Sequence, residues 1–454
     1  MAEKKLLKNG VVIIHDTDDT ARGVRADLLI DGDKITQIKP DIGSSAGVTV
    51  IDCTDKVIAP GFIDTHRHMY NIALRGRHGD DLLPDYLVKA KVAISATVAS
   101  GLRSIYGYCF NGRVDSWSPF SLNPSFIAPF ALDALKRLAS SAPFGNGRIT
   151  LGVAFDGWFL PKDMIVSLFQ NIKTLGIRHV TTHNSSSPPG RPTSIETMHS
   201  CGVLTPDSTV ILAHANNLAP NDIKLVKENG AYLSSTPSVE LQMGMGTPIC
   251  FDPARDVQAN SSLGVDCHNV VLTSIVSEMR CALAHSRSMY NDKFRAAGKM
   301  AAQINHTVQE AYALGTIQGA RAVGLENEIG SLAVGKKADI IVFDALAPSM
   351  ICGAQHDPIT AIVMHSTPGD IVMTFVDGIL RKDAGKLLPM QITSEDAEVV
   401  GVKDTMISWS DVTRNLLKTQ ESVQARLKKL DLEAAKKDAC TALGMDTSII
   451  TSKL

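Results

Sequence analysis

Short runs of β-branched residues, separated by Asp and Gly turns, fill the first part of the chain. Between residues 5 and 58 these runs lie at 10–14, 27–30, 34–38 and 48–51, a pattern typical of small antiparallel β units. Short strands and Gly turns return between residues 327 and 343. We therefore predict that two β-rich segments, residues 1–58 and 328–393, pair into one β-sandwich domain.

The pattern between residues 60 and 324 is different, because apolar strands and polar turns alternate with helical stretches of ten or more residues. The strand runs lie at 149–154, 180–182, 210–213, 232–235 and 263–265. Repeated βα units with buried strands indicate a parallel sheet, and this many in series favours a closed barrel. Residues 59–327 are thus expected to form a (β/α)8-type TIM barrel, which makes the fold class α/β.

The last part of the chain, residues 394–454, is charged, and its segment 411–442 has a helical pattern. We expect a helical arm that packs on the barrel or on another subunit of a homo-oligomer. The chain ends in Ser452-Lys453-Leu454, the tripeptide that the peroxisomal import receptor binds. The sequence therefore predicts peroxisomal localisation, with the cytoplasm as the alternative.

The composition of the chain favours a small molecule as its binding partner. The 454 residues are 44% hydrophobic, enough to bury a large core, and 45 basic side chains nearly balance 47 acidic ones. No basic block suggests nucleic-acid binding, and no apolar run is long enough to span a membrane. The eight cysteines lack CxxC pairs, which is typical of reduced thiols.

Polar residues that follow apolar strand runs are the candidates for chemistry, because catalytic groups of a βα barrel project from the carboxyl ends of its strands. His66 and His68 follow the apolar run that begins at Ala59, and their i, i+2 spacing on a strand turns both imidazoles to one face. Three further strand-end residues complete the set, which are His183, His214 and Asp266. Together they offer enough nitrogen and oxygen atoms to bind one divalent ion and keep a position open for water.

This ordered set resembles the amidohydrolase superfamily of metal-dependent hydrolases, and within it the branch of triazine hydrolases and cyclic-amidine deaminases. The resemblance rests on the segment 59–68, on the three later strand-end residues and on the segment 320–339. It extends over about residues 8 to 390. It implies a hydrolase that cleaves a carbon–nitrogen bond other than a peptide bond by means of a metal-activated water.

The resemblance also implies a role for each residue. His66, His68, His183 and Asp266 would bind a single zinc ion, with iron or manganese as alternatives. His214 would polarise the water or the substrate, and Asp266 would also accept the proton of the attacking water. The fourth strand ends in Ala154-Phe-Asp-Gly-Trp158 without a lysine, which disfavours a carbamylated lysine and a second ion.

One residue departs from the deaminase pattern. Deaminases of this branch carry a glutamate three residues after the strand-five histidine, where it protonates the substrate ring, and this chain has Ser186 there. Glu240, which follows the expected seventh strand, is the candidate to supply a catalytic carboxylate instead. Its alternative interpretation is a loop carboxylate without a role in the reaction.

A second departure concerns length. Only about forty residues separate His68 from the third-strand candidate 103–108, where family barrels need a helix, a strand and another helix. A helix is expected at 82–100, but no clear second strand. Either one βα unit of the barrel is degraded or missing, or residues 89–94 contribute an irregular piece.

Three functional hypotheses follow from these observations. The first is a mononuclear metal hydrolase that cleaves an amide or amidine C–N bond of a small cyclic or aromatic substrate. The second is a hydrolytic deaminase of a purine, pterin or triazine ring, with Glu240 as the acid. The third is an inactive or binding paralogue whose barrel is truncated.

Overall fold

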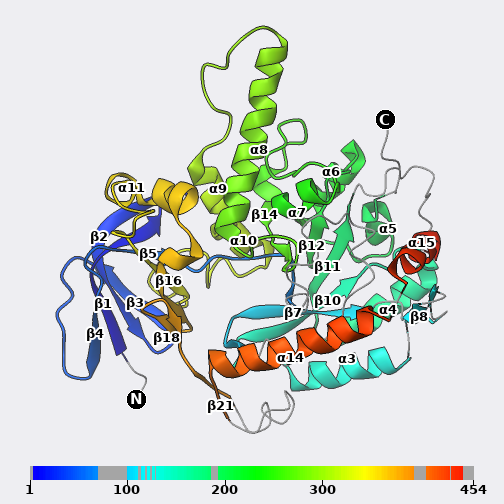
Figure 1. Cartoon of the computed structure of the whole chain (residues 1–454), viewed down its shortest axis with the longest axis horizontal. Helices are drawn as coiled ribbons and strands as arrows, with labels where there is room; N and C mark the ends of the chain where they lie inside the picture. The colour runs from blue at the N-terminus through cyan, green and yellow to red at the C-terminus, as the bar shows by residue number, and fades with distance from the viewer. Residues whose placement is uncertain are drawn as a thin grey trace.

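The computed structural model describes residues 4–69, 100–110, 114–117, 120–122, 125–127, 129–185, 193–392, 405–429 and 431–442. Strands from the two β-rich segments form one nine-stranded sheet, whose order is β19-β18-β17-β16-β5-β1-β2-β3 with β4 beside β1. The two segments join where β5 pairs antiparallel with β16 (Figure 1). The strands are β1 (Lys4–His15), β2 (Ala21–Asp31), β3 (Lys34–Lys39), β4 (Val48–Asp52), β5 (Lys56–Pro60), β16 (Ile340–Asp344), β17 (Ile371–Val376), β18 (Ile379–Asp383) and β19 (Lys386–Leu387).

This sheet curls around its own core. Buried residues of β2 and β3 share one apolar cluster with buried residues of β16 and β17, although these strand pairs lie at opposite sides of the β5–β1 centre of the sheet. Short helices connect β16 to β17 and pack toward the central part of the molecule. They are α11 (Gly353–His356), α12 (Pro358–Thr360), the π-helical turn η3 (Ala361–His365) and the 3₁₀ turn η4 (Pro368–Asp370).

The central part of the chain forms a six-stranded parallel sheet in the order β14-β13-β12-β11-β10-β7. The apolar runs predicted at 103–108, 149–154, 180–182, 210–213 and 232–235 are all strands of this sheet, and the run at 263–265 begins at the end of β14. The strands are β7 (Ser104–Phe110), β10 (Ile149–Phe155), β11 (His179–Asn184), β12 (Thr209–His214), β13 (Tyr232–Ser235) and β14 (Ser261–Leu263).

Helices alternate with these strands along the chain, and α4 to α6 share their apolar cluster with the strands, as βα units require (Figure 1). The helices are α3 (Pro129–Ser141), α4 (Lys162–Thr174), α5 (Ile195–Ser200), α6 (Pro220–Glu228), α7 (Pro237–Gln242), α8 (Ile275–Ala296), α9 (Val308–Leu314) and α10 (Ile317–Ala322), with the 3₁₀ turn η2 (Gln258–Asn260). The prediction of an α/β fold with a parallel sheet is confirmed.

A further pair of short parallel strands carries the residues of interest. β6 (Arg67–His68) pairs with β15 (Asp266–Cys267), and β15 continues the chain from β14 after a break of two residues. Gly264 lies in that break, and a Cβ atom there would lie 2.8 Å from both the Cβ and the backbone oxygen of His66. The break therefore brings the chain segments of His66 and Asp266 into direct contact.

The segment between β6 and β7 is where one βα unit was predicted to be degraded or missing. Residues 70–99 lie outside the described residues, as do the irregular piece expected at 89–94 and most of the helix expected at 82–100. After β7 the chain forms a hairpin, β8 (Val114–Trp117) and β9 (Phe120–Leu122), which sequence reasoning did not predict.

Two helices, α14 (Trp409–Leu427) and α15 (Leu432–Ala442), cover most of the predicted helical segment 411–442. The side chain of Ser408 caps α14 by accepting a hydrogen bond from the backbone of Asp411, and the strands β20 (Met390–Gln391) and β21 (Met406–Ile407) precede the helix. No helix within the described ranges is both long and apolar enough to cross a membrane. Residues 452–454 lie outside those ranges, so peroxisomal import stays a prediction.

Candidate metal centre

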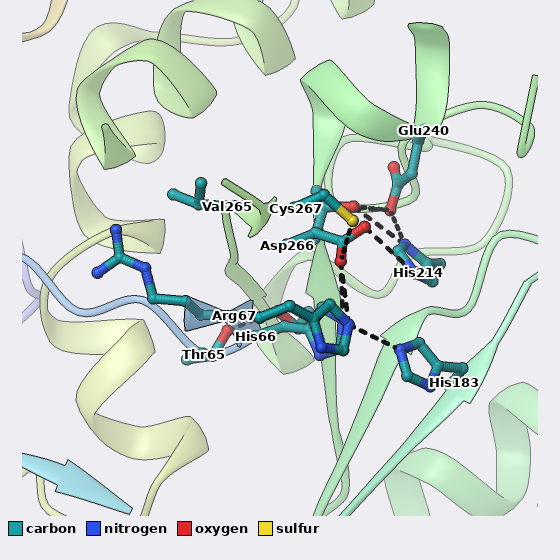
Figure 2. Close-up of polar contacts among 12 residues, drawn as sticks. Thr65, His66, Arg67, His183, His214, Glu240, Val265, Asp266 and Cys267 are labelled. Carbon is teal, nitrogen blue, oxygen red and sulfur yellow. Dashed lines mark hydrogen bonds and ion pairs between the residues drawn. The ribbon is translucent and has the colours of Figure 1, made fainter. Parts of the chain in front are cut away.

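His66 and His68 lie side by side at the start of the site. His68 is the second residue of β6, and His66 directly precedes the strand. Figure 2 shows that the side chain of Arg67 points away from the His66 ring. The two ring centroids are 4.9 Å apart with perpendicular planes. Arg67 forms an ion pair with Asp64 at 3.0 Å, which fixes the residue between the histidines.

The ring atoms of four predicted residues converge with one carboxylate. The Nε2 atom of His68 lies 3.1 Å from Nε2 of His183 and 3.2 Å from Oδ1 of Asp266. His66 places its Nε2 atom 3.5 Å from the same Oδ1 atom. Two groups, His66–His183–His214 and His66–His68–Asp266, each bring their ligand atoms within 4.8 Å of one another.

These residues fit a divalent ion. Two imidazole nitrogens 3.1 Å apart need a shared cation or a shared proton between them, because their lone pairs repel each other. The buried Nε2 atom of His66 makes no hydrogen bond in the described part of the chain. Three imidazole nitrogens and one carboxylate oxygen form a donor set that suits zinc, with a position left for water.

The protonation states agree with this fit. Burial lowers the pKa of His66 to about 3 and the pKa of His214 to about 4, so both rings are neutral at pH 7. Burial by itself would raise the pKa of the Asp266 carboxyl, but the neighbouring side chains of His66 and His68 outweigh it and hold that pKa well below its usual value. Neutral imidazoles and an ionised carboxylate are the forms that bind a metal ion.

Two site residues have a strained backbone. His214 ends β12 with φ of 67°, and Asp266 begins β15 with φ of 61°, both in the left-handed region that side chains with a Cβ atom rarely adopt. Such residues cost roughly 1–3 kcal/mol each and are held in place by their surroundings. The left-handed residue comes at the end of the strand at His214 and at the beginning of the short strand β15 at Asp266.

Sequence reasoning missed Asp156, which follows β10. Its Oδ2 atom lies 2.8 Å from Nδ1 of His183, and its Oδ1 atom accepts a hydrogen bond from the backbone N–H of His183 at 2.9 Å. Burial would raise the pKa of Asp156, but His183 and these hydrogen bonds outweigh it and keep the carboxyl ionised. The signal was present in the sequence, because Asp156 is a strand-end residue like the four histidines.

Glu240 is brought to the site, but behind His214. It is fully buried in α7, and its Oε1 atom accepts a hydrogen bond from the backbone N–H of Thr236 at 2.8 Å. The same Oε1 atom lies 3.3 Å from Nδ1 of His214, and the hydroxyl of Thr236 lies 3.0 Å from that nitrogen. On the other side of the ring, Nε2 of His214 lies 3.9 Å from Oδ2 of Asp266 (Figure 2).

The position of Glu240 bears on its predicted role as the acid that protonates a substrate ring. The His214 imidazole separates Glu240 from Asp266 and the ligand cluster, so a substrate next to the cluster would meet His214 first. Burial raises the pKa of Glu240 to about 8, which keeps most of this carboxyl protonated at pH 7. Ser186, at the position where the deaminases have their glutamate, lies outside the described residues.

This cluster of histidine and aspartate side chains beside parallel strands is typical of one class of protein, the metal-dependent hydrolases. Residues 173–380 match the model of the Amidohydrolase family, a range that includes His183, His214 and Asp266. The chain thus carries an amidohydrolase family domain, and the resemblance to the amidohydrolase superfamily is confirmed. The predicted enzyme class, a hydrolase of carbon–nitrogen bonds, is confirmed with it.

Relatives of known activity align along nearly their whole length. A 5'-deoxyadenosine deaminase of Methanobrevibacter smithii is 25% identical over 438 residues, which cover 85% of this chain and 94% of the relative. A 5-methylthioadenosine/S-adenosylhomocysteine deaminase of Symbiobacterium thermophilum is also 25% identical, over 83% of this chain and 93% of the relative.

Solved structures share the fold. An adenosine deaminase from Xanthomonas campestris with bound zinc superposes with a TM-score of 0.69 at 17% identity, over 94% of this chain and 99% of that one. A guanine deaminase from C. acetobutylicum superposes with a TM-score of 0.63 at 16% identity, over 83% of this chain and 99% of the other. An atrazine chlorohydrolase of Arthrobacter aurescens in complex with zinc gives the same score and identity, over 87% and 98%.

Proposed function

We propose that this protein is a zinc-dependent deaminase that hydrolyses the exocyclic amidine C–N bond of a purine-like ring and releases ammonia. The observation that carries the proposal is the convergence of His66, His68, His183 and Asp266 on one point beside His214. The relatives at 25% identity are deaminases of 5'-deoxyadenosine and of 5-methylthioadenosine or S-adenosylhomocysteine, which supports a purine-like ring. Deamination of a purine-like ring is the second hypothesis drawn from the sequence, in which Glu240 was expected to be the acid.

The four ligands would hold the ion, and a zinc ion in that position would acidify the attacking water by several pK units. Water adds to the amidine carbon and the bond to the exocyclic nitrogen breaks. One proton of the water leaves in ammonia, the other ends on the adjacent ring nitrogen, and a ring carbonyl forms. Asp266 accepts the proton of the water at Oδ2, because Oδ1 is engaged by the histidines and by the thiol of Cys267 at 3.2 Å. His214 presents Nε2 on the same side and polarises the water or the substrate.

Glu240 has an orienting role in this scheme. It lies with Thr236 against Nδ1 of His214, which fixes the ring and leaves Nε2 directed toward Asp266. A protonation of the substrate by Glu240 is not favoured, since the imidazole lies between them. We propose that Asp266 returns the proton to the leaving nitrogen, as the carboxylate that first accepted it.

We also propose that the central strands belong to a closed (β/α)8 barrel. The support is the pairing of β6 with β15 next to β14, which would close the parallel sheet on the side of strand one, and the likeness to solved amidohydrolase folds. The nine-stranded sheet shares one core between its two halves, and we propose that it serves as the predicted β-sandwich. An inactive paralogue with a truncated barrel is disfavoured, because the ligand residues converge.

Ammonia release from a panel of amino heterocycles tests the proposed activity. The purified protein, loaded with zinc, is incubated with 5'-deoxyadenosine, 5'-methylthioadenosine, S-adenosylhomocysteine, guanine and an aminotriazine. We expect ammonia and the corresponding ring carbonyl from at least one purine. Absence of ammonia from every compound, with zinc bound to the protein, would refute deamination of these rings.

Two variants control this assay. His66→Ala removes a ligand and should lower the rate by roughly a hundredfold or more. His199→Ala changes an exposed histidine of α5 outside the site and should leave the rate unchanged. Equal rates for both variants would show that the activity arises elsewhere or from a contaminant.

A further inference from the structure

Asp156 holds the metal-site residue His183 by two separate hydrogen bonds. One carboxylate oxygen, Oδ2, lies 2.8 Å from ring nitrogen Nδ1, and the other, Oδ1, accepts the backbone N–H of the same residue at 2.9 Å. The two contacts fix both the ring and the backbone that carries it. Asp156 directly follows β10, and His183 lies near the end of the neighbouring strand β11, so the contact joins the ends of adjacent parallel strands.

The ring contact decides which nitrogen of His183 carries the proton. An ionised carboxylate only accepts hydrogen bonds, so Nδ1 must be the donor. In a neutral ring Nε2 then carries the lone pair. This Nε2 atom is the one that lies 3.1 Å from Nε2 of His68 and faces the ligand cluster. The tautomer that Asp156 selects is therefore the one that binds an ion at the cluster.

Asp156 is itself held by a chain of hydrogen bonds. The hydroxyl of Thr182 donates to Oδ1 of Asp156 at 2.9 Å and accepts the indole N–H of Trp158 at 2.8 Å. The indole stacks on Phe169 with ring centroids 5.6 Å apart and meets Phe155 edge-on at 4.9 Å. A carboxylate fixed at both oxygens cannot rotate away from the ring that it orients.

We propose that Asp156 is a positioning residue for the metal centre, which holds His183 in the tautomer that presents Nε2 to the ion. The proposal rests on the proposed function only in that an ion binds at the cluster. It requires no particular substrate. Asp156 also differs from the acid of the deaminase branch, because its carboxylate already binds the ring and the backbone N–H of His183 and the hydroxyl of Thr182.

The isosteric change Asp156→Asn isolates this role. Its amide oxygen can still accept the bonds from Thr182 and from the His183 backbone, but its NH₂ group now faces Nδ1 and is a donor. The imidazole would then have to accept at Nδ1 and carry its proton on Nε2, where it blocks the ion. Loss of such an outer partner costs about 10–100-fold in metal affinity.

Zinc affinity of the metal-free full-length chain, measured by competition with a chromophoric chelator, tests the proposal with zinc alone as the ligand. The same samples are melted without zinc. We expect Asp156→Asn to bind zinc about 10–100-fold more weakly with little change in the melting temperature of the metal-free protein. The control Asp163→Asn, an exposed residue in the first turn of α4, should match the wild type in both measurements.

A second variant covers the case in which Asp156→Asn does not fold. Thr182→Val removes the donor to Oδ1 and should weaken zinc binding in the same direction but by less, a few-fold. Wild-type zinc affinity in Asp156→Asn, or in Thr182→Val if the first variant is unfolded, would overturn the proposal. A purely structural role would lower the melting temperature of the metal-free protein and leave the zinc affinity unchanged. Since no substrate is used, failure of the deaminase panel would not affect this result.

Discussion

Gly264 lies where the two segments that carry His66 and Asp266 touch, and its replacement by alanine should damage both the fold and the site. The added Cβ atom would lie 2.8 Å from the Cβ atom of His66, from the backbone oxygen of His66 and from Oγ of Ser234. Two of these three atoms cannot rotate away, since the oxygen belongs to the backbone and the Cβ atom is fixed by it. The segments must separate instead.

The size of the effect follows from these distances. Ordinary contact begins near 3.4 Å, so the gap must open by roughly 0.6 Å. Overpacking of this kind costs about 1–3 kcal/mol. The backbone hydrogen bond from Asp266 to the oxygen of His66, 2.8 Å long, would stretch by a similar amount and lose much of its roughly 1 kcal/mol. We expect a total near 2–4 kcal/mol.

Zinc binding should fall as well, because metal sites tolerate ligand displacements of only about 0.2 Å. The assay is thermal unfolding of the metal-free protein together with zinc competition. Gly107→Ala is the matched control in strand β7, where the new Cβ atom would lie 3.5 Å from its neighbour. If Gly264→Ala behaves like Gly107→Ala in both measurements, the close approach of the two segments does not hold.

Three further predictions concern buried polar groups. Glu240→Gln should retain most of the activity, because the glutamine oxygen still accepts the hydrogen bond from Thr236 and the amide is neutral, like the protonated carboxyl of Glu240, whose pKa burial raises to about 8. Glu240→Leu should lose activity. Loss of activity in Glu240→Gln in a rate assay would instead support the acid role. Thr65→Val should destabilise the protein by about 1–3 kcal/mol in chemical unfolding, because the buried hydroxyl of Ser234 loses its 2.7 Å hydrogen bond with the hydroxyl of Thr65. An unchanged midpoint of unfolding would contradict this prediction. Burial lowers the pKa of His15 to about 4, so between pH 6.5 and 4 the unfolded chain binds a proton that the folded chain does not, and stability falls as the pH falls through that window. His15→Phe should remove about 2 kcal/mol of the loss of stability between pH 7 and pH 5. Parallel pH profiles of stability for the two proteins would refute this prediction.

The sequence was sufficient to predict the strands of the parallel sheet and the residues that form the cluster. Both rest on local patterns, since apolar runs mark the strands and the residue after each run lies at the catalytic edge. His66 and His68 were accessible in this way because their i, i+2 spacing fixes their common face. The pairing of the two β-rich segments was also predictable, because neither could bury its apolar strands alone.

The contacts around the cluster could not be predicted with the same means. Asp156 reaches His183 on the neighbouring strand, and Glu240 reaches His214 from a helix that begins after the next strand. Such contacts depend on register and on the direction of side chains, which spacing along the chain does not determine. The role of Gly264 depends on the distance between two segments that are far apart in sequence, which a sequence pattern does not contain.

Metal content of the purified protein tests the central claim most directly. Mass-spectrometric metal analysis of the wild type, after removal of loosely bound ions, should give about one equivalent of zinc per chain. His66→Ala and Asp266→Asn should lose most of it, while His199→Ala should retain it. Less than about half an equivalent of zinc, iron or manganese in the wild type, with no further loss in His66→Ala, would contradict the account.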